Sequence, residues 1–277
     1  MPPNVYENVR SVLQRISAAS AMSPGRQGVS LVAVSKSKPA AAIREAYRAG
    51  QRVFGENYIN EMRNKQDMLR DLDDLEWHFI GHLQMNKCKK LVRCPRLSCV
   101  QSVDSIRVAN KLQQACHYWP PLSKAILDVF IQVKTSEENT KSGCTIENLL
   151  PLAWNIVRMC PRLRLAGLMT IGEYGDDTCF DRLAACRSEV ANSLGMAEDE
   201  LHLSMGMSDD FETAIRYGAT TVRVGTTIFG PRHEIYRPSS DEPDDGATAA
   251  NDESDENDDH DDDKSNEDDD PKNKADM

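Results

Sequence analysis

Long apolar runs are missing from this chain of 277 residues. No stretch approaches the roughly 18 consecutive apolar residues that a transmembrane helix requires, so we expect no membrane association. The N-terminal sequence MPPNVYENVRSVLQRI has polar residues where a secretory signal peptide would be apolar. Both absences predict a cytoplasmic protein, and they leave an organellar pool open.

Closely paired cysteines are also missing. The eight cysteines are scattered along the chain and no CxxC pair occurs, which disfavours a disulfide framework. Cys88, Cys94 and Cys99 lie near one another, but their spacing matches no zinc-binding motif. We therefore expect reduced thiols and no bound metal.

Basic and apolar residues are scarce at the C-terminal end of the chain. From Pro238 to Met277 there are 18 acidic residues and three lysines, whereas the preceding part has 30 basic and 26 acidic residues. Such a segment cannot bury enough surface to offset the entropy lost on ordering. We expect one folded domain over residues 1–237 and a disordered acidic tail over 238–277. The tail either solvates the protein, docks onto a basic partner or mimics nucleic-acid charge; we expect no nucleic-acid binding.

One pattern repeats between residues 29 and 225: a short apolar, β-branched segment followed by a longer segment with helical spacing. The strand candidates are residues 29–35, 52–57, 77–81, 99–103, 128–133, 165–171, 202–206 and 221–225. Apolar strands that alternate with helices indicate a parallel sheet covered on its faces. Eight such units in sequence favour an α/β fold with a closed (β/α)8 barrel of the TIM type over an open, doubly wound sheet.

Helix signals support this alternation. The segment after Pro39 ends before Gly50, as helix starts and stops favour, and residues 104–117 begin with Asp104 or Ser105 as an N-cap. Further helices are expected over residues 145–159, 178–194 and 208–217. An additional helix, at about residues 4–20, is expected to cover the bottom of the barrel.

The C-terminal ends of the strands carry the candidate functional residues, because the active face of a (β/α)8 barrel lies there. Lys36 leaves the first strand at this end. Partial burial lowers the pKa of such an amine and makes it a nucleophile that captures an aldehyde as an imine. The alternative is a surface lysine paired with a phosphate or a carboxylate. Lys38 competes for the same role, but it precedes Pro39 and is expected to lie in the turn.

The stretch from the seventh to the eighth strand predicts an anion site. Ser204 and Ser208 offer hydroxyl groups, Gly206 allows close backbone approach, and Gly225 and Thr226 supply N–H groups and a hydroxyl. Loops at this position commonly bind phosphate together with a helix N-terminus. The alternative is turn chemistry in which Ser208-Asp209-Asp210 caps the following helix, and the two roles are compatible.

Three histidines differ in position. His78 and His202 are expected near the starts of strands, where a structural role is favoured, whereas His82 follows the third strand at the active face. His82 has no obvious carboxylate partner in the sequence. Glu56 is a candidate carboxylate partner for His82, although a structural ion pair for Glu56 is an equal alternative.

These motifs together resemble the pyridoxal phosphate homeostasis protein family. The matching segments are LVAVSKSKP (31–39), FGENYINE (54–61), WHFIGHLQMNK (77–87), QSVDS (101–105), IQVKTSEENTKSG (131–143), LAGLMTIG (165–172), HLSMGMSDDFETAI (202–215) and VRVGTTIFGPR (222–232). The resemblance implies a fold-type III barrel like the N-terminal domain of alanine racemase. It implies pyridoxal 5'-phosphate (PLP) bound covalently to a lysine and held for intracellular vitamin B6 homeostasis, without established catalytic turnover.

The resemblance also implies roles for individual residues. The Schiff base falls on Lys36, and the phosphate contacts fall on Ser208, Gly225 and Thr226. Arg223 falls on the position expected near the pyridine nitrogen, where its permanent charge would disfavour ring protonation. The alternative for Arg223 is a pair with a carboxylate at the barrel mouth. The resemblance also implies that Asn57, His82 and Met85 line the pocket or lie close to it.

Four functions follow from this sequence. The first is a monomeric PLP carrier whose expected partners are apo PLP-dependent enzymes. The second is a PLP-dependent amino-acid racemase or decarboxylase, which would need a second acid/base group on the opposite substrate face, usually contributed by another domain or subunit. The third is an aldolase-like barrel that forms a lysine imine with a sugar phosphate. The fourth is a binding module that acts through the acidic tail.

Overall fold

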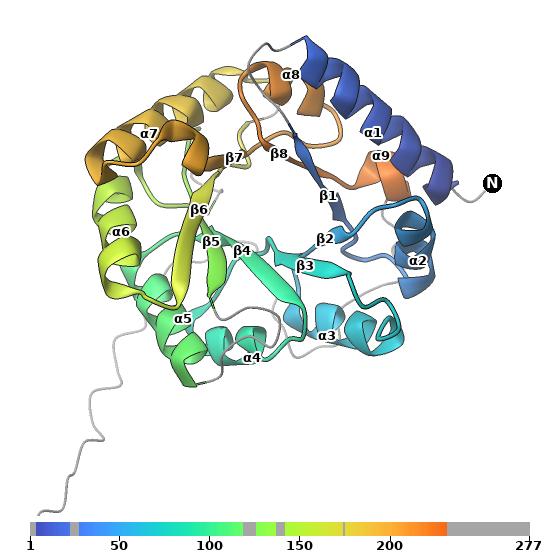
Figure 1. The fold of residues 1–277 in the computed structure, drawn as a ribbon, viewed down its shortest axis with the longest axis horizontal. Helices are drawn as coiled ribbons and strands as arrows, with labels where there is room; N and C mark the ends of the chain where they lie inside the picture. The colour runs from blue at the N-terminus through green and yellow to red at the C-terminus, as the bar shows by residue number, and fades with distance from the viewer. Residues whose placement is uncertain (1–3, 23–27, 119–125, 137–141, 174, 232–277) are drawn as a thin grey trace, which may run out of the picture. The chain divides into compact units, whose positions relative to one another are not determined.

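The chain folds into a closed barrel of eight parallel strands in the order β1 to β8, in a computed structural model that describes residues 4–22, 28–118, 126–136, 142–173 and 175–231 (Figure 1). The strands are β1 Ser30–Val34, β2 Val53–Glu56, β3 Glu76–Phe79, β4 Leu97–Val103, β5 Leu127–Gln132, β6 Leu163–Met169, β7 His202–Ser204 and β8 Thr221–Val224. β8 pairs with β1 in parallel, which closes the barrel. The predicted (β/α)8 class is therefore confirmed.

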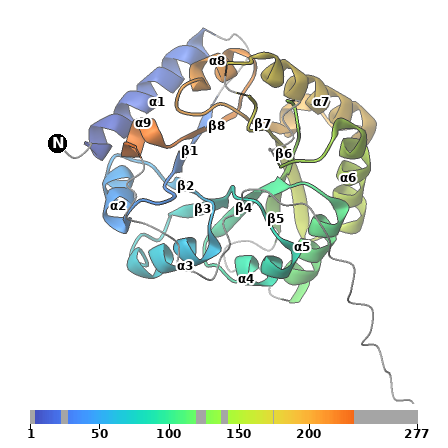
Figure 2. The same ribbon diagram turned by 180° about the vertical axis from the view of Figure 1, so that it is seen from behind.

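Helices surround the barrel in both end-on views (Figures 1 and 2). They are α1 Val5–Ala21, α2 Ala40–Arg48, α3 Ile59–Met68, α4 Cys88–Val92, α5 Ile106–Tyr118, α6 Ile146–Met159, α7 Thr178–Leu194, α8 Phe211–Arg216 and α9 Thr226–Phe229, with 3-10 turns η1 Met85–Lys87 and η2 Glu198–Glu200. Among the residues described, none of these helices combines the length and apolar character that a membrane crossing requires. The predicted acidic tail lies outside the described residues.

All strands except β4 end one or two residues before the apolar pattern does. The residues just beyond the ladder leave the strand and form the turns of the mouth, by which we mean the C-terminal ends of the strands. Apolar character persists there because these turns pack on the barrel: Val133 is 1% exposed and Met205 is fully buried. Hydrophobic pattern alone therefore overestimates strand length at this end.

The largest hydrophobic core lies between the strands and the helices, and a second, smaller cluster is formed by three neighbouring strands. The smaller cluster consists of buried residues from β4, β5 and β6: Cys99, Phe130, Ala166 and Met169. All eight cysteines of the chain are buried free thiols.

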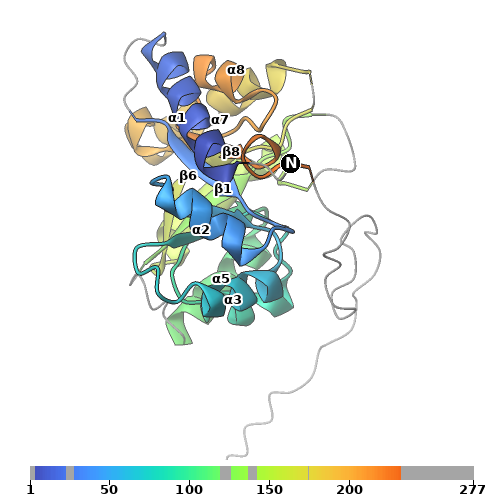
Figure 3. The same ribbon diagram turned by 90° about the vertical axis from the view of Figure 1, so that its right-hand side faces the viewer.

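The position of α1 corrects one sequence-based expectation. Helix α1 does not cover the bottom of the barrel; it lies in the outer ring between α8 and α2, outside β1 (Figures 1 and 3). Val5, Val9, Val12 and Ile16 repeat at helical spacing and form one buried face of α1. The helix packs against α8 and α9. α8 has only six residues, and α1 covers the wall that such a short helix leaves open.

A bidentate ion pair attaches α1 to α8. The Arg15 guanidinium donates to both carboxylate oxygens of Glu212 at 2.6 and 2.7 Å, and it lies 4.6 Å from the ring centroid of Phe211. Both charged side chains are about two-fifths exposed or slightly less. Solvent screening therefore limits the strength of this pair.

We predict that Arg15→Ala lowers the free energy of unfolding by about 1 kcal/mol, because it removes an exposed bidentate pair and a cation–π contact. Arg10→Ala, at an exposed position on the same helix, is the matched control and should change stability by less than about 0.5 kcal/mol. Urea unfolding at low and high salt measures both. Equal effects of the two substitutions would contradict a specific role for this contact.

Candidate functional site

Lys36 lies in the turn that directly follows β1, at the mouth of the barrel. Its side chain is partly buried. The next residue, Ser37, has a left-handed backbone conformation with φ of 58°, which is uncommon for a residue other than glycine. Lys38 is 7% exposed, and its ammonium donates to the carbonyl oxygens of Gly230 and Pro231. Lys38 is therefore engaged in holding the chain after α9.

A buried charged cluster holds the turn that carries Lys36. We define the carboxylate cluster as Glu56 at the end of β2 with Glu61 and Lys65 of α3. The Lys65 ammonium donates to Glu56 at 2.7 Å, to Glu61 at 2.6 Å and to the Ser35 carbonyl at 2.7 Å. The Ser35 hydroxyl donates to Glu56, and the Ser37 N–H donates to Glu61, both at 2.6 Å. The residues on both sides of Lys36 are thus fixed to one cluster.

The carboxylate cluster has more acid than base. Glu56 is fully buried, Glu61 is 2% exposed and Lys65 is 4% exposed. Burial raises the pKa of Glu56 to about 7, although the Lys65 ammonium opposes this shift and the Glu61 carboxylate adds to it. In both glutamates the Oε2 atom is buried and has no hydrogen-bond partner among the described residues. One ammonium therefore compensates two carboxyl groups, and Glu56 exchanges its proton close to neutral pH.

Ser208 connects the loop after β7 to the start of α9. Its hydroxyl oxygen accepts from the N–H groups of Gly225 and Thr227, both at 3.3 Å. Thr227 in turn donates its hydroxyl to the Ser208 carbonyl at 3.4 Å. The alternative from the sequence, in which Ser208-Asp209-Asp210 caps the following helix, holds for its last residue: that helix begins at Phe211 and Asp210 occupies its N-cap position, without a side-chain cap hydrogen bond. Ser208 itself accepts from the start of α9.

Two glycines allow the loop after β7 and the start of α9 to pack closely against their neighbours. Gly206 has φ of 90°, and an added Cβ would lie 2.5 Å from Cβ of Ala214. At Gly225 an added Cβ would lie 3.3 Å from both Cβ and the carbonyl oxygen of Val34. Lys36 follows Val34 by two residues, so the α9 start and the Lys36 turn occupy neighbouring strand ends. Thr226, the first residue of α9, is exposed.

Arg223 is buried inside the barrel. It lies on β8, pairs with Val32 of β1 and is 5% exposed. Its guanidinium donates to the Ser204 hydroxyl and to the Thr170 carbonyl, both at 2.8 Å. Burial lowers the pKa of Arg223 to about 10, with the charge of Asp210 acting in the opposite direction. Arg223 therefore remains a cation at neutral pH, and its hydrogen bonds to Ser204 and Thr170 go to neutral oxygens.

Ser204 does not join the Ser208–α9 group. It is fully buried at the end of β7, and its hydroxyl accepts from Arg223 and donates to Gln101 at 2.7 Å. Both hydrogen-bonding directions of the hydroxyl are thus engaged inside the barrel. The structure places Ser204 in support of Arg223, whereas the sequence grouped it with the anion site.

Asn57 follows β2 at the mouth. Its backbone carbonyl packs against Gly81, where an added Cβ would lie 2.2 Å from the Asn57 oxygen. The side-chain Oδ1 atom of Asn57 is buried and has no hydrogen-bond partner among the residues described. A buried, unsatisfied amide oxygen at this position indicates a place where a bound group with a donor would be accommodated.

The histidines take different partners from those expected. His82 is exposed, and its Nδ1 atom lies 3.6 Å from the Asp104 carboxylate. Glu56, the partner considered from the sequence, is engaged with Lys65. His78 is the third residue of β3 and forms a 2.9 Å hydrogen bond with Gln101.

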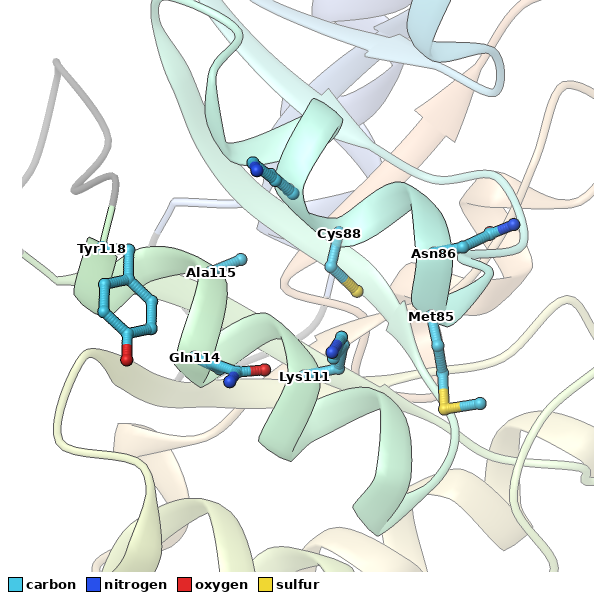
Figure 4. A pocket seen from close by; sticks show the side chains of 8 residues that line it. Met85, Asn86, Cys88, Lys111, Gln114, Ala115 and Tyr118 are labelled. Carbon is cyan, nitrogen blue, oxygen red and sulfur yellow. The ribbon is translucent and has the colours of Figure 1, made fainter. Parts of the chain in front are cut away.

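Met85 opens onto a pocket on the outer wall. This pocket has a volume of about 300 Å³ and lies between η1–α4 and α5 (Figure 4). In Figure 4 the side chains of Met85 and Cys88 face Lys111 across it. The predicted cofactor contact for Met85 stays a prediction.

Several residues of the site were missed from the sequence. Thr227 joins Ser208 only because α9 turns directly after Gly225. Glu61 and Lys65 carried a readable signal, because acidic and basic residues at i and i+4 on a helix pair with one another. Gln101 gave no signal, because its partner Ser204 is 103 residues away.

A scan of protein families places this chain in a known domain family. Residues 8–233 match the model described as alanine racemase, N-terminal domain. The chain is 44% identical to the pyridoxal phosphate homeostasis protein of Pseudomonas aeruginosa, over 82% of this chain and 96% of that protein. It is 41% identical to the protein of the same name from Mus musculus, over 76% of this chain and 80% of that protein.

Solved structures give the same result. PipY of Synechococcus elongatus, solved with PLP bound, is 35% identical, with a TM-score of 0.65 over 78% of this chain and 99% of that chain. Alanine racemase from Corynebacterium glutamicum has a TM-score of 0.58 at 15% identity, over 81% of this chain and 60% of that chain. The second likeness concerns the fold alone.

The carboxylate cluster predicts a pH dependence of stability. Because the folded protein raises the pKa of Glu56 from its ordinary 4.5 to about 7, it binds this proton more tightly than the unfolded chain does. The resulting stabilisation is fully present below about pH 4.5 and is lost as pH rises through about 7. We predict that Glu56→Gln makes the free energy of unfolding less dependent on pH across this window.

Urea unfolding at several pH values between 5 and 8 measures this effect, at an ionic strength held constant. Glu45→Gln, at an exposed position of α2, removes a carboxylate without touching the cluster and should retain the wild-type slope. If Glu56→Gln also retained the wild-type slope, the proton would not reside on Glu56.

Proposed function

The chain belongs to the pyridoxal phosphate homeostasis proteins and contains the alanine racemase N-terminal domain, and from this we propose that it stores PLP covalently at the barrel mouth without catalytic turnover. In this role it would contribute to vitamin B6 homeostasis and would supply PLP to apo-enzymes. One observation carries the proposal. An amine, a buried guanidinium and a hydroxyl-capped helix start lie at or beside the adjacent ends of β8 and β1.

We assign the anchoring amine to Lys36. PLP, when bound, would supply an aldehyde carbon, and the Lys36 Nζ atom would be the amine that condenses with it, with loss of water. The carboxylate cluster holds Ser35 and Ser37, so the turn presents Lys36 in one direction. Lys38 is the nearest competing amine in the sequence, and its two carbonyl acceptors keep it engaged.

We assign the phosphate to the start of α9. The N–H groups in the first turn of a helix have no partners within the helix, and they favour a negative charge. Ser208, Gly225 and Thr226 would contact the phosphate, and Thr227 joins them through its contacts with Ser208. The N–H bonds to Ser208 are long, at 3.3 Å, so a phosphate oxygen would compete for these donors at small cost.

We assign the pyridine ring to the space beside Arg223. The guanidinium has donors beyond the two that bind Ser204 and Thr170. A cation that cannot give up its proton would donate to the ring nitrogen and disfavour ring protonation. A ring in this state stabilises carbanions poorly, which supports storage over amino-acid chemistry. Asn57, with its unsatisfied buried oxygen, would lie against the bound group, and the segment of His82 and Met85 stays assigned to its surroundings.

We predict that the purified protein is yellow with PLP and that borohydride fixes the cofactor to Lys36. Lys36→Ala should lose the colour while keeping its unfolding midpoint, because a mouth residue contributes little to core packing. Lys111→Ala, an exposed lysine of α5, is the control and should keep both. Peptide mapping after reduction checks the site, and cofactor found mainly on another lysine would refute the assignment.

Ser208→Ala should separate phosphate recognition from ring recognition. We expect roughly tenfold weaker binding of PLP, because about one hydrogen bond to a charged group is lost. Binding of pyridoxal, which lacks the phosphate, should not change. Ser188→Ala on α7, whose hydroxyl bonds only within its own helix in the structure, is the control. Equal losses for PLP and pyridoxal would place the phosphate elsewhere.

A racemase or a decarboxylase remains the competing function. Both would convert amino acids in the presence of PLP, whereas a storage protein would not. Incubation with L- and D-alanine, lysine and ornithine followed by chiral and amine analysis distinguishes them. Sustained turnover that Lys36→Ala abolishes would replace the storage proposal with an enzymatic one.

A further inference from the structure

A chain of four hydrogen-bonded side chains crosses the barrel from β8 to β3. Arg223 donates to Ser204 at 2.8 Å, Ser204 donates to Gln101 at 2.7 Å, and the Gln101 amide nitrogen lies 2.9 Å from Nδ1 of His78. We call these four residues the relay. Neither Gln101 nor His78 was assigned a contact with the bound cofactor above.

The relay passes through the interior of the barrel. Ser204 is on β7 and Gln101 is on β4, and strands β5 and β6 separate them in the closed sheet. Both end-on views place β3 and β4 across the barrel from β7 and β8 (Figures 1 and 2). A direct bond between their side chains therefore spans the interior. Ser204 and Gln101 are fully buried, so water does not compete for these bonds.

The permanent charge of Arg223 sets the direction of every bond in the relay. A guanidinium only donates, so the Ser204 hydroxyl accepts from it and has one hydrogen to give. That hydrogen goes to the Gln101 oxygen, which turns the Gln101 amide N–H toward His78. Nδ1 of His78 must then accept, and it can accept only without a proton. Arg223 thus selects the His78 tautomer that carries its proton on Nε2.

We propose that Gln101 and His78 are positioning residues for Arg223, and that His78 holds the relay in one direction as a neutral Nδ1 acceptor. The role of Arg223 toward a ring nitrogen rests on the proposed function, whereas the direction of the relay does not. Each bond orders the next one. Loss of the acceptor at His78 would free the Gln101 amide to reverse, which would present a donor to Ser204. Ser204 would then accept from both sides, and Arg223 would lose a firmly oriented partner.

The first experiment uses the protein without cofactor. Nitrogen-15 NMR of labelled histidine distinguishes a protonated ring nitrogen from an unprotonated one, and His78→Gln assigns the resonances. We expect wild-type His78 to have an unprotonated Nδ1 and a protonated Nε2. A proton on Nδ1 of wild-type His78 would overturn the relay, whatever the protein binds.

An isosteric substitution reverses the last bond. Gln101→Glu still accepts from Ser204, but it presents a second oxygen to His78, so we expect the proton to move to Nδ1 or the ring to become doubly protonated. Gln114→Glu, at an exposed position of α5, adds the same charge and should leave His78 unchanged. Ser204→Ala, which uncouples Gln101 from Arg223, should give a mixture of tautomers. An unchanged His78 in both relay variants would overturn the proposal.

The second experiment reads Arg223 through bound PLP. We expect Gln101→Glu and Ser204→Ala to shift the pH profile of cofactor absorbance while changing PLP affinity by less than about tenfold, because the phosphate contacts are untouched. Ser204→Thr, which keeps the hydroxyl, should restore the wild-type profile. Bound PLP with an unchanged profile in both variants would overturn the positioning role. Failure of the wild-type protein to take up PLP would overturn the proposed function instead, and the cofactor-free NMR result would still decide the relay.

Discussion

A cation buried inside the barrel is the constraint on which the rest of the site depends. Arg223 has almost no contact with solvent and retains its charge through bonds to neutral oxygens. A buried charge without good partners costs several kcal/mol, so the side chains around it have little freedom. Ser204 and Gln101 are polar side chains at fully buried positions, and both are linked to this cation by hydrogen bonds.

The turn that carries Lys36 is stabilised by hydrogen bonds to a buried cluster of two carboxyl groups and one ammonium. Its neighbours are bound to carboxyl groups outside the barrel wall, and those groups share a single ammonium. The inside of the barrel contains an isolated positive charge, and the outside of β1 and β2 contains an excess of acid. Strand β1 lies between the two. The Lys36 turn is thus held from the acidic side of this strand, and Arg223 lies on its other side.

The fold and the order of the site residues along the chain were predictable, and the contacts between them were not. Lys36, Ser208 and Arg223 could be located because strand ends in a parallel barrel meet at one face, which is a consequence of topology. The strand ends were overestimated, because apolar residues beyond the ladder pack as well as those within it. Contacts such as Ser204 with Gln101 join residues across the barrel, and their pairing depends on strand register, which periodicity does not encode. Helix α1 was misplaced for a related reason: its apolar face was visible, but the shortness of α8 was not.

The burial of every cysteine bears on the aldehyde chemistry proposed for Lys36. Thiolates add to aldehydes to form thiohemiacetals, and they would divert an electrophile from the lysine that should receive it. Burial raises the pKa of Cys94, Cys116 and Cys144 to about 12, so these sulfurs stay protonated as well as inaccessible. A chain with eight thiols would therefore present almost no thiol chemistry to a bound aldehyde.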